Sequence, residues 1–168
     1  MNRIAEFEKV SFERFLEDAM SCYDSKDESV IKEIYDNIKM PVRKTKGAAG
    51  FDFLLPVTAT IEPGQSITIP TGIKARIEDG WFLSLYPRSS LGFKYKLTLD
   101  NTVGIIDSDY YSSKREGHIL AKMTNHSSST AIIKSDEGFM QGIFLQFGIT
   151  YTDDATTERQ GGFGSTNK

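Results

Sequence analysis

Apolar positions with a helical spacing open the chain. Between residues 11 and 23 they recur every three or four positions, and Ser11 stands where a helix N-cap is expected. The same spacing returns from Val30 and stops before Pro41, which cannot continue a helix. The pattern predicts two short helices within residues 1–40, preceded by a short apolar segment that suits a strand.

From Phe51 onward the pattern changes to short runs rich in Ile, Thr, Phe and Tyr. Turn-forming residues separate these runs at 62–64, 78–80, 108–109 and 136–138. Turns that return this regularly are typical of a β-sandwich, jelly roll or barrel. We therefore expect a mainly β core, a jelly-roll-like barrel or sandwich, over residues 41–151, in one domain with the helical pair. Four aromatic side chains at strand spacing are expected in its core: Trp81, Phe82, Phe144 and Phe147.

Composition narrows the classes of function. The chain has 168 residues, enough for one domain, and a net charge of −3, which argues against a broad nucleic-acid surface. A small anion needs only a few local cations. Cys22 is the single cysteine and there are two histidines, so neither a disulfide within the chain nor a Cys/His zinc cluster is expected. No apolar run approaches the roughly 20 residues of a membrane helix, and no signal-peptide core opens the chain, so we expect a cytoplasmic protein without membrane contact.

Residues 152–168 contain three glycines and almost no apolar side chains. Such a segment cannot hold itself folded. It is either a frayed terminus or a flexible arm that orders over a ligand. In the second case Arg159 would meet phosphate and Phe163 would cover a flat ring.

Arg88 follows an apparent strand and lies between Pro87 and Ser89. Its guanidinium can act as a planar fork for phosphate oxygens, while Ser89 and Ser90 add hydroxyl and backbone donors. An Arg–Ser pair after a strand is also common in plain surface turns. Both interpretations stay open on this motif alone.

Asp107 follows two isoleucines and is expected to leave a buried strand at a hairpin. An ionised aspartate there can orient and deprotonate a water molecule as a general base, or it can cap the turn. Asp109 suits the turn better, which leaves Asp107 for a site.

Two further polar residues lie among apolar ones. Asp52 follows the small residues 47–50 and can hold a Mg²⁺-bound water, pair with an arginine or accept hydrogen bonds in a buried turn. Gln141 interrupts an apolar strand and either faces a partner or is satisfied internally.

Five separated blocks, in this order, resemble those of the trimeric deoxyuridine triphosphate nucleotidohydrolases, the dUTPases. Each block is modest alone, but the ordered set is specific and spans residues 41–168. The blocks are Ala49–Phe53, Pro87–Gly92, Asn101–Tyr110, the segment around Gln141, and Arg159–Thr166.

The resemblance implies hydrolysis of dUTP to dUMP and pyrophosphate with Mg²⁺, which limits uracil incorporation into DNA and supplies dUMP for thymidylate synthesis. Asp107 would activate the water that attacks the α-phosphorus, and Asp52 would support Mg²⁺ through water. Tyr110 would pack on the deoxyribose and exclude a 2′-hydroxyl, and Phe163 would stack on uracil. Uracil would be recognised by Asn101 and the backbone of Gly104, Ile105 and Ile106.

The resemblance also implies a homotrimer whose active sites are shared between subunits. The residues that would hold phosphate are Arg88, Ser89, Ser90, Gln141, Arg159, Gly164, Ser165 and Thr166.

The chain departs from the family pattern in several places. Ser90 and Gly138 replace a usual glycine and a usual arginine, the connection after Tyr110 is longer, and the fifth block is one residue shorter. The purpose of the two helices before Pro41 is open.

Two alternatives compete. A nucleotide-sensing regulator would bind dUTP and a protein partner, although nothing in the sequence indicates such a partner. A dCTP deaminase would need a catalytic glutamate where Lys122 stands, so deamination is disfavoured.

Overall fold

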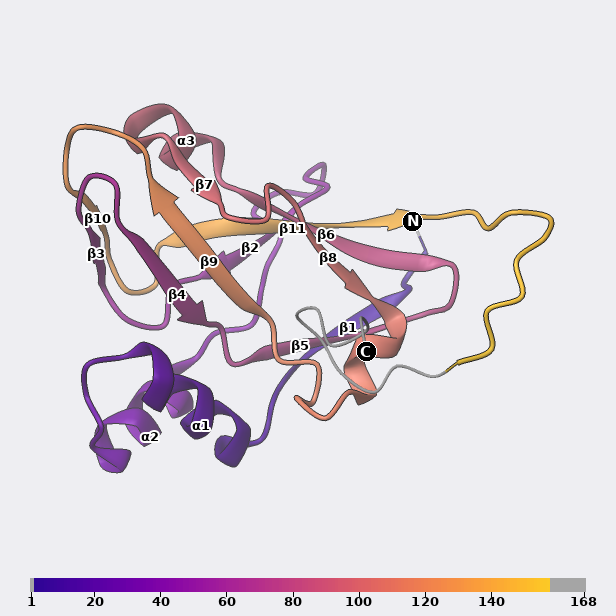
Figure 1. The fold of residues 1–168 in the computed structure, drawn as a ribbon, viewed down its shortest axis with the longest axis horizontal. Helices are drawn as coiled ribbons and strands as arrows, with labels where there is room; N and C mark the ends of the chain where they lie inside the picture. The colour runs from indigo at the N-terminus through magenta and orange to yellow at the C-terminus, as the bar shows by residue number, and fades with distance from the viewer. Residues whose placement is uncertain (1, 158–168) are drawn as a thin grey trace.

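The computed structural model describes residues 2–157 as a β body with a pair of helices beneath it (Figure 1). Helix α1 covers Phe12–Cys22, and its N-cap Ser11 accepts a hydrogen bond from the Arg14 amide through its hydroxyl, as predicted. Helix α2 covers Glu28–Asn37. It ends before Pro41 because the amide of Ile38 already bonds to the Tyr35 carbonyl in a tighter turn.

Strands form most of the remaining structure, so the predicted mainly β fold is confirmed. They pair as β1–β5, β10–β3, β2–β11–β6–β8 and β4–β9–β7. All pairings are antiparallel, and β11 and β6 form the long centre of the largest sheet. The strands are β1 Ala5–Lys9, β2 Phe51–Leu54, β3 Ala59–Ile61, β4 Ser66–Pro70, β5 Ile73–Ile77, β6 Trp81–Pro87, β7 Leu97–Leu99, β8 Gly104–Asp107, β9 Leu120–Asn125, β10 Ala131–Ile133 and β11 Gly138–Gln146. Two short helices complete the body, α3 Ser89–Tyr95 and the 3₁₀ helix η1 Ser108–Ser112.

Three of the four predicted turns join strands. Gly64 and Gly80 have positive φ between β3 and β4 and between β5 and β6, and Asp136 has positive φ before β11. The hairpin expected after Asp107 is wrong. Residues 108–112 form η1 instead, because β8 and β9 belong to different sheets and cannot be joined by a tight turn.

Alternating apolar side chains from both sides of the body form its core. Leu83, Ile133 and Phe139 have no exposed surface, and Trp81 and Phe144 pack against them as expected. Phe82 was also expected in this core, but it is only half-buried and does not belong to the core cluster. Phe147 was expected there too, but it is 50% exposed. The reason is that β11 ends at Gln146, which leaves the next side chain outside the sheet.

The N-terminal segment is joined to the body through β1, which pairs with β5 along its whole length. Val10, Phe15 and Ile31 form a second buried cluster between the helices. Gly72 lies beneath it with φ +71°, and a Cβ there would overlap Ile38. This close approach fixes the helical pair against the start of β5. No helix within residues 2–157 has both the length and the apolar character to cross a membrane.

Candidate active site

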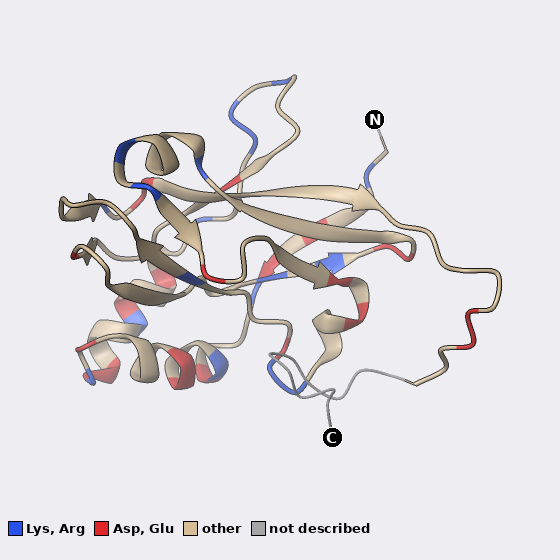
Figure 2. Ribbon diagram, turned by 45° about the horizontal axis from the view of Figure 1, so that its top comes forward, with Lys and Arg blue, Asp and Glu red and all other residues tan. Residues whose placement is uncertain are grey.

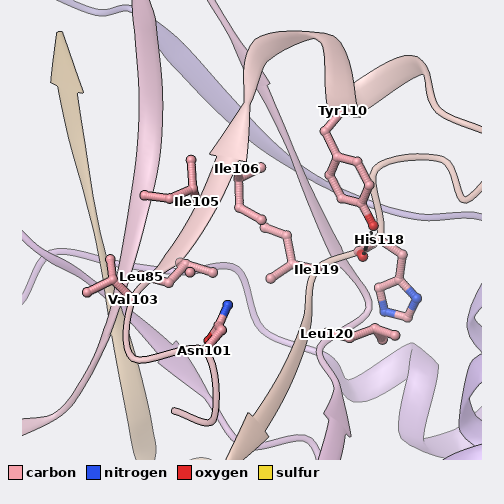
Figure 3. A pocket seen from close by; sticks show the side chains of 10 residues that line it. Leu85, Asn101, Val103, Ile105, Ile106, Tyr110, His118, Ile119 and Leu120 are labelled. Atoms are coloured by element: carbon pink, nitrogen blue, oxygen red, sulfur yellow. Dashed lines mark hydrogen bonds between the residues drawn. The ribbon is translucent and has the colours of Figure 1, made fainter. Parts of the chain in front are cut away.

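A cavity of about 330 Å³ opens beside β8 (Figure 3). All five described residues for which the sequence predicted contact with base or sugar line it: Asn101, Gly104, Ile105, Ile106 and Tyr110. Phe163 lies outside the described residues. The wall is completed by residues that the sequence analysis did not select, namely Leu85, Val103, His118, Ile119 and Leu120. We call this cavity the Asn101 pocket.

A tight turn between β7 and β8 forms the mouth of this pocket. Thr102 has φ +60°, and the amide of Val103 donates to the carbonyl of Asn101 at 2.6 Å. Gly104 then pairs with Leu85 of β6, and a Cβ on Gly104 would lie 3.0 Å from the Cβ of Leu85. Glycine therefore allows the strand backbone, rather than a side chain, to face the cavity.

Tyr110 lies in η1 and is 5% exposed. Its hydroxyl donates to the backbone carbonyl of His118 at 2.9 Å, and this bond is visible in Figure 3. The ring is thus fixed at both ends, by η1 and by the segment before β9. No local signal in the sequence marks His118 as part of the wall, because only the tertiary fold brings it to Tyr110.

Asp107 is the last residue of β8, pairs with Phe82 of β6 and is half-buried. It directly follows the pocket residue Ile106, although Asp107 itself is not in the wall. The strand is less buried than expected, because Ile105 is 52% exposed. Asp107 therefore lies at the rim of the pocket on a partly open strand.

A second group of predicted residues gathers where β6 ends; we call Asp52, Arg88, Ser89, Ser90 and Gln141 the Arg88 cluster. Gln141 of β11 pairs with Asp52 of β2, and the Arg88 amide donates to the Phe139 carbonyl of β11. Ser89 and Ser90 begin α3, so this motif is the start of a helix rather than a plain turn.

Asp52 and Arg88 form an ion pair in this cluster. Nη1 of Arg88 lies 3.5 Å from Oδ2 of Asp52, which is 7% exposed. This distance is long for a hydrogen bond, and Oδ2 is buried with no hydrogen-bond donor among the described residues. Asp52 therefore retains capacity to accept a hydrogen bond, for instance from a metal-bound water.

Two glycines leave room for the side chains of the cluster. A Cβ on Gly50 would lie 2.6 Å from Oε1 of Gln141, and a Cβ on Gly138 would lie 2.6 Å from Nη1 of Arg88. The absence of side chains at both positions thus decides where Gln141 and Arg88 lie.

Asp107 and the Arg88 cluster lie at opposite ends of β6. Asp107 pairs with Phe82 near the start of that strand, whereas Arg88 follows its last residue. Arg88 lies six positions after Phe82 along the chain, which corresponds to about 20 Å at the usual rise per residue. Figure 1 shows α3 at one end of the sheet and η1 at the other. Within one chain, Arg88 and Asp107 cannot both contact one α-phosphate.

Charges elsewhere are distributed without a single basic face. Lysine and arginine are interspersed with aspartate and glutamate along the ribbon of residues 2–157 (Figure 2). Within these residues, no three His, Cys, Asp or Glu side chains come together as a metal site. A divalent metal used here would be held mainly by the phosphates of a nucleotide, with Asp52 as a water-mediated contact.

One buried charge cluster was not predicted. Asp18 of α1 is 4% exposed and accepts hydrogen bonds from Arg14, Arg115 and His118. Burial would raise the pKa of the Asp18 carboxyl, but His118 and the two arginines outweigh it and hold this pKa below its usual value. For His118, burial lowers the pKa even though Asp18 opposes that shift. His118 is therefore neutral in the folded protein at pH 7.

Comparisons with known proteins show the family of this chain. The family model described as dUTPase matches residues 36–167. The deoxyuridine 5′-triphosphate nucleotidohydrolase of Lactococcus lactis is 39% identical over 142 residues, which cover 83% of this chain and 95% of that protein. The enzyme of the same name from Nautilia profundicola is 38% identical over 143 residues, 82% of this chain and 97% of that protein. These relatives carry the name of the predicted hydrolase, and they do not favour the regulator or the deaminase.

A solved structure gives the same result. The crystal structure of the dUTPase from Streptococcus mutans superposes with a TM-score of 0.64 at 32% identity, covering 86% of this chain and 97% of that one. Sequence and fold agree, and the chain belongs to the dUTPase family, whose members hydrolyse dUTP to dUMP.

Proposed function

We propose that this chain hydrolyses dUTP in the cytoplasm as a Mg²⁺-dependent homotrimer, in which water attacks the α-phosphorus and pyrophosphate leaves. The observation that carries the proposal is the Asn101 pocket, which brings together every described residue predicted for base and sugar. We further propose that residues 41–151 are the catalytic body, that residues 1–40 belong to the same domain, and that residues 152–168 are a closing arm.

Recognition of the base rests on the turn before β8. Asn101 offers an amide, and the backbone of Gly104, Ile105 and Ile106 offers N–H and C=O groups that suit the edge of uracil. The family resemblance implies that this turn is too narrow for the methyl group of thymine. Tyr110 would lie against the deoxyribose, where a 2′-hydroxyl would meet its ring.

The Arg88 cluster and the metal would neutralise the negative charge of the triphosphate. Hydrolysis of a phosphoanhydride depends mainly on positioning and on stabilising charge. Arg88 supplies a partly exposed guanidinium held beside Asp52, and Ser89, Ser90 and Gln141 supply neutral donors. Mg²⁺ would arrive with the triphosphate, polarise it and contact Asp52 through water. That role suits the unsatisfied Oδ2 of Asp52.

Asp107 is proposed as the general base. It lies at the rim of the pocket, one residue after Ile106, where the α-phosphate of a nucleotide bound by its base would emerge. A carboxylate there orients a water molecule and accepts its proton as the oxygen attacks phosphorus. The phosphate-binding residues would stabilise the charge of the leaving pyrophosphate, and bound Mg²⁺ would supply further positive charge.

The homotrimer is supported by the separation of the two groups. Because Arg88 and Asp107 of one chain lie about 20 Å apart along β6, one triphosphate would draw them from different copies. A symmetric oligomer brings the Arg88 cluster of one subunit to the Asn101 pocket of another. Each active site would therefore be incomplete in a single chain.

The arm would complete the site. Phe163 would stack on uracil, and the phosphates would be contacted by Arg159, Gly164, Ser165 and Thr166. These residues lie outside the described part of the chain, and their roles rest on the family resemblance. By removing dUTP and releasing dUMP, the enzyme would limit uracil in DNA and supply thymidylate synthesis.

The test is pyrophosphate release from dUTP, dTTP, dCTP and UTP with Mg²⁺ present, together with an assay for ammonia from dCTP. We expect release from dUTP at a kcat/KM at least roughly a hundredfold above the other three. Inactivity toward dUTP, or ammonia release from dCTP, would overturn the proposal. Light scattering measures the molar mass in solution and thus the oligomeric state. A mass equal to that of one chain would contradict a site shared between subunits.

A further inference from the structure

Helix α1 is joined to the segment that precedes β9, residues 113–118, by a buried set of charges; we call this segment the 113–118 connection. The carboxylate of Asp18 accepts two hydrogen bonds from Arg14, one from Nε and one from Nη2, each at 3.0 Å. The same carboxylate accepts a hydrogen bond from Nη2 of Arg115. It accepts another from Nδ1 of His118 at 2.6 Å. Four donors from two elements thus converge on a single buried carboxylate.

The tautomer of His118 follows from its second ring nitrogen. Nε2 accepts the amide of Gly72 at 2.8 Å, so the hydrogen of the neutral ring lies on Nδ1 and faces Asp18. The ring has no exposed surface. Both nitrogens are therefore occupied, and the position of the ring is set by α1 on one side and by Gly72 on the other.

A second tie joins the same two elements. The carboxylate of Glu116 accepts the amide of Ser11 at 2.9 Å and the hydroxyl of Ser11 at 2.7 Å. Glu116 has φ +54°, and Gly117 follows with φ +70°. The N-terminus of α1 is thus capped from the 113–118 connection, and this connection adopts an unusual backbone course to reach it.

The same connection forms the sugar side of the pocket. His118 lines the cavity, and its carbonyl accepts the Tyr110 hydroxyl at 2.9 Å. Figure 3 shows the Tyr110 ring reaching His118 from η1, with Ile119 and Leu120 beside it. A continuous chain of contacts therefore runs from Asp18 through His118 to Tyr110.

We propose that Asp18 is a positioning residue that sets the selectivity for deoxyribose over ribose, by fixing the 113–118 connection and thereby the ring of Tyr110. The inference rests on the proposed function, in which Tyr110 packs on the sugar. It gives the N-terminal helices a role and joins them to the lengthened connection after Tyr110. Asp18 precedes residues 36–167, which match the family model, whereas its partners Arg115 and His118 lie within that match.

Exclusion of ribose depends on how firmly the ring of Tyr110 is held. A 2′-hydroxyl adds one oxygen to the sugar, and a rigid ring in van der Waals contact excludes it only while that ring stays in place. Loosening the carbonyl of His118 releases the hydroxyl of Tyr110. The ring can then shift enough to admit ribose, while the Asp107 strand, held by β6, stays unchanged.

Three variants separate positioning from general stability. Asp18→Asn keeps the shape and removes the charge that holds Arg115 and His118. Arg115→Gln removes one donor at a side chain that is 33% exposed, and it is the gentler change. Ile31→Ala is the matched control. Ile31 is fully buried between the helices, so its truncation destabilises them. The substitution removes no hydrogen bond to the 113–118 connection.

The measurement is kcat and KM for dUTP and for UTP, with the affinities of dUDP and UDP in the presence of Mg²⁺. We expect Asp18→Asn to lower the dUTP-to-UTP ratio of kcat/KM roughly tenfold, with kcat for dUTP within about threefold of wild type. Arg115→Gln should shift the ratio in the same direction by less. Ile31→Ala should lower the melting temperature and leave the ratio unchanged.

An unchanged ratio in folded Asp18→Asn overturns the inference, and so does an equal shift in Ile31→Ala. If Asp18→Asn does not fold, Arg115→Gln decides by the same criterion. A wild type without dUTP hydrolysis refutes the proposed function instead. In that case the preference for dUDP over UDP, and its loss in the variants, still tests the brace.

Discussion

Gly138 and Arg88 are packed so closely that a Cβ on Gly138 would lie 2.6 Å from Nη1 and 3.0 Å from Cδ of Arg88. The bare backbone at this point lets the guanidinium lie beside Asp52. The family resemblance implies that related proteins usually carry an arginine where this chain has Gly138. In this chain the side chain of Arg88 occupies the space beside Gly138. The position of Arg88 therefore depends on the glycine that replaces the usual arginine.

Substituting Gly138 by alanine is expected to displace Arg88. The backbone accepts the change, because Gly138 is not among the glycines with positive φ. We expect kcat/KM for dUTP to fall roughly tenfold or more, since misplacing a phosphate-binding group by about 1 Å is costly. The control is Gly148→Ala, which adds the same methyl group where no atom lies within 4 Å. Equal activity of both variants would contradict the role of this contact.

Mixed oligomers test whether sites are shared. Arg88→Ala and Asp107→Asn should each be nearly inactive alone, because each removes one part of every site. After equal amounts are unfolded and refolded together, about a quarter of the sites should combine an intact Arg88 from one subunit with an intact Asp107 from another. Pyrophosphate release should reappear accordingly. Mixtures that stay as inactive as the single variants would show that each chain builds its own site.

Acid should weaken the fold through His118. Its folded pKa is lowered by burial, with Asp18 opposing the shift and Arg14 and Arg115 supporting it. Below the usual histidine pKa of about 6.5, the unfolded chain therefore binds a proton at His118 that the folded chain does not bind. The free energy of unfolding then falls as the pH drops below that value, by at most about 1.4 kcal/mol per pH unit. Urea unfolding at pH 7.5 and 5.5 measures this loss.

The matched variants identify the group that titrates. His118→Asn should be less stable at pH 7.5 but lose less on acidification, because the titrating ring is gone. His126→Asn changes an exposed histidine and should keep the wild-type pH dependence. If His126→Asn flattens the profile and His118→Asn does not, the assignment is wrong.

Deleting residues 159–168 should remove most turnover while the melting temperature stays close to wild type. The expected reason is that the segment adds no apolar core but supplies Arg159 and Phe163 to the closed site. Turnover of dUTP and thermal unfolding of the truncated protein provide the check. Undiminished turnover would rule out a catalytic arm.

Local signals in the sequence were sufficient for much of the fold. The hydroxyl of Ser11 marked the start of α1, and the glycines at 64 and 80 marked turns that require positive φ. These features act over a few residues, so a sequence pattern can show them. The end of β11 carried no such signal, and Phe147 was therefore misplaced in the core.

The pocket was predictable only in part. Asn101, Gly104 and Tyr110 lie within ten residues of each other and carry the family pattern, whereas His118 enters the wall through an irregular connection. Its partner Asp18 is 100 residues away in sequence. No periodicity links two polar residues at that separation, so the charge cluster could be found only in the folded structure.

The central claim is that Asp107 activates the attacking water, and the most direct measurement is the kcat for pyrophosphate release from dUTP by Asp107→Asn. Loss of a general base should lower kcat about a thousandfold with little change in KM. Asp109→Asn, two residues on in η1, serves as the control and should stay close to wild type. A kcat for Asp107→Asn within about twofold of wild type would contradict the account.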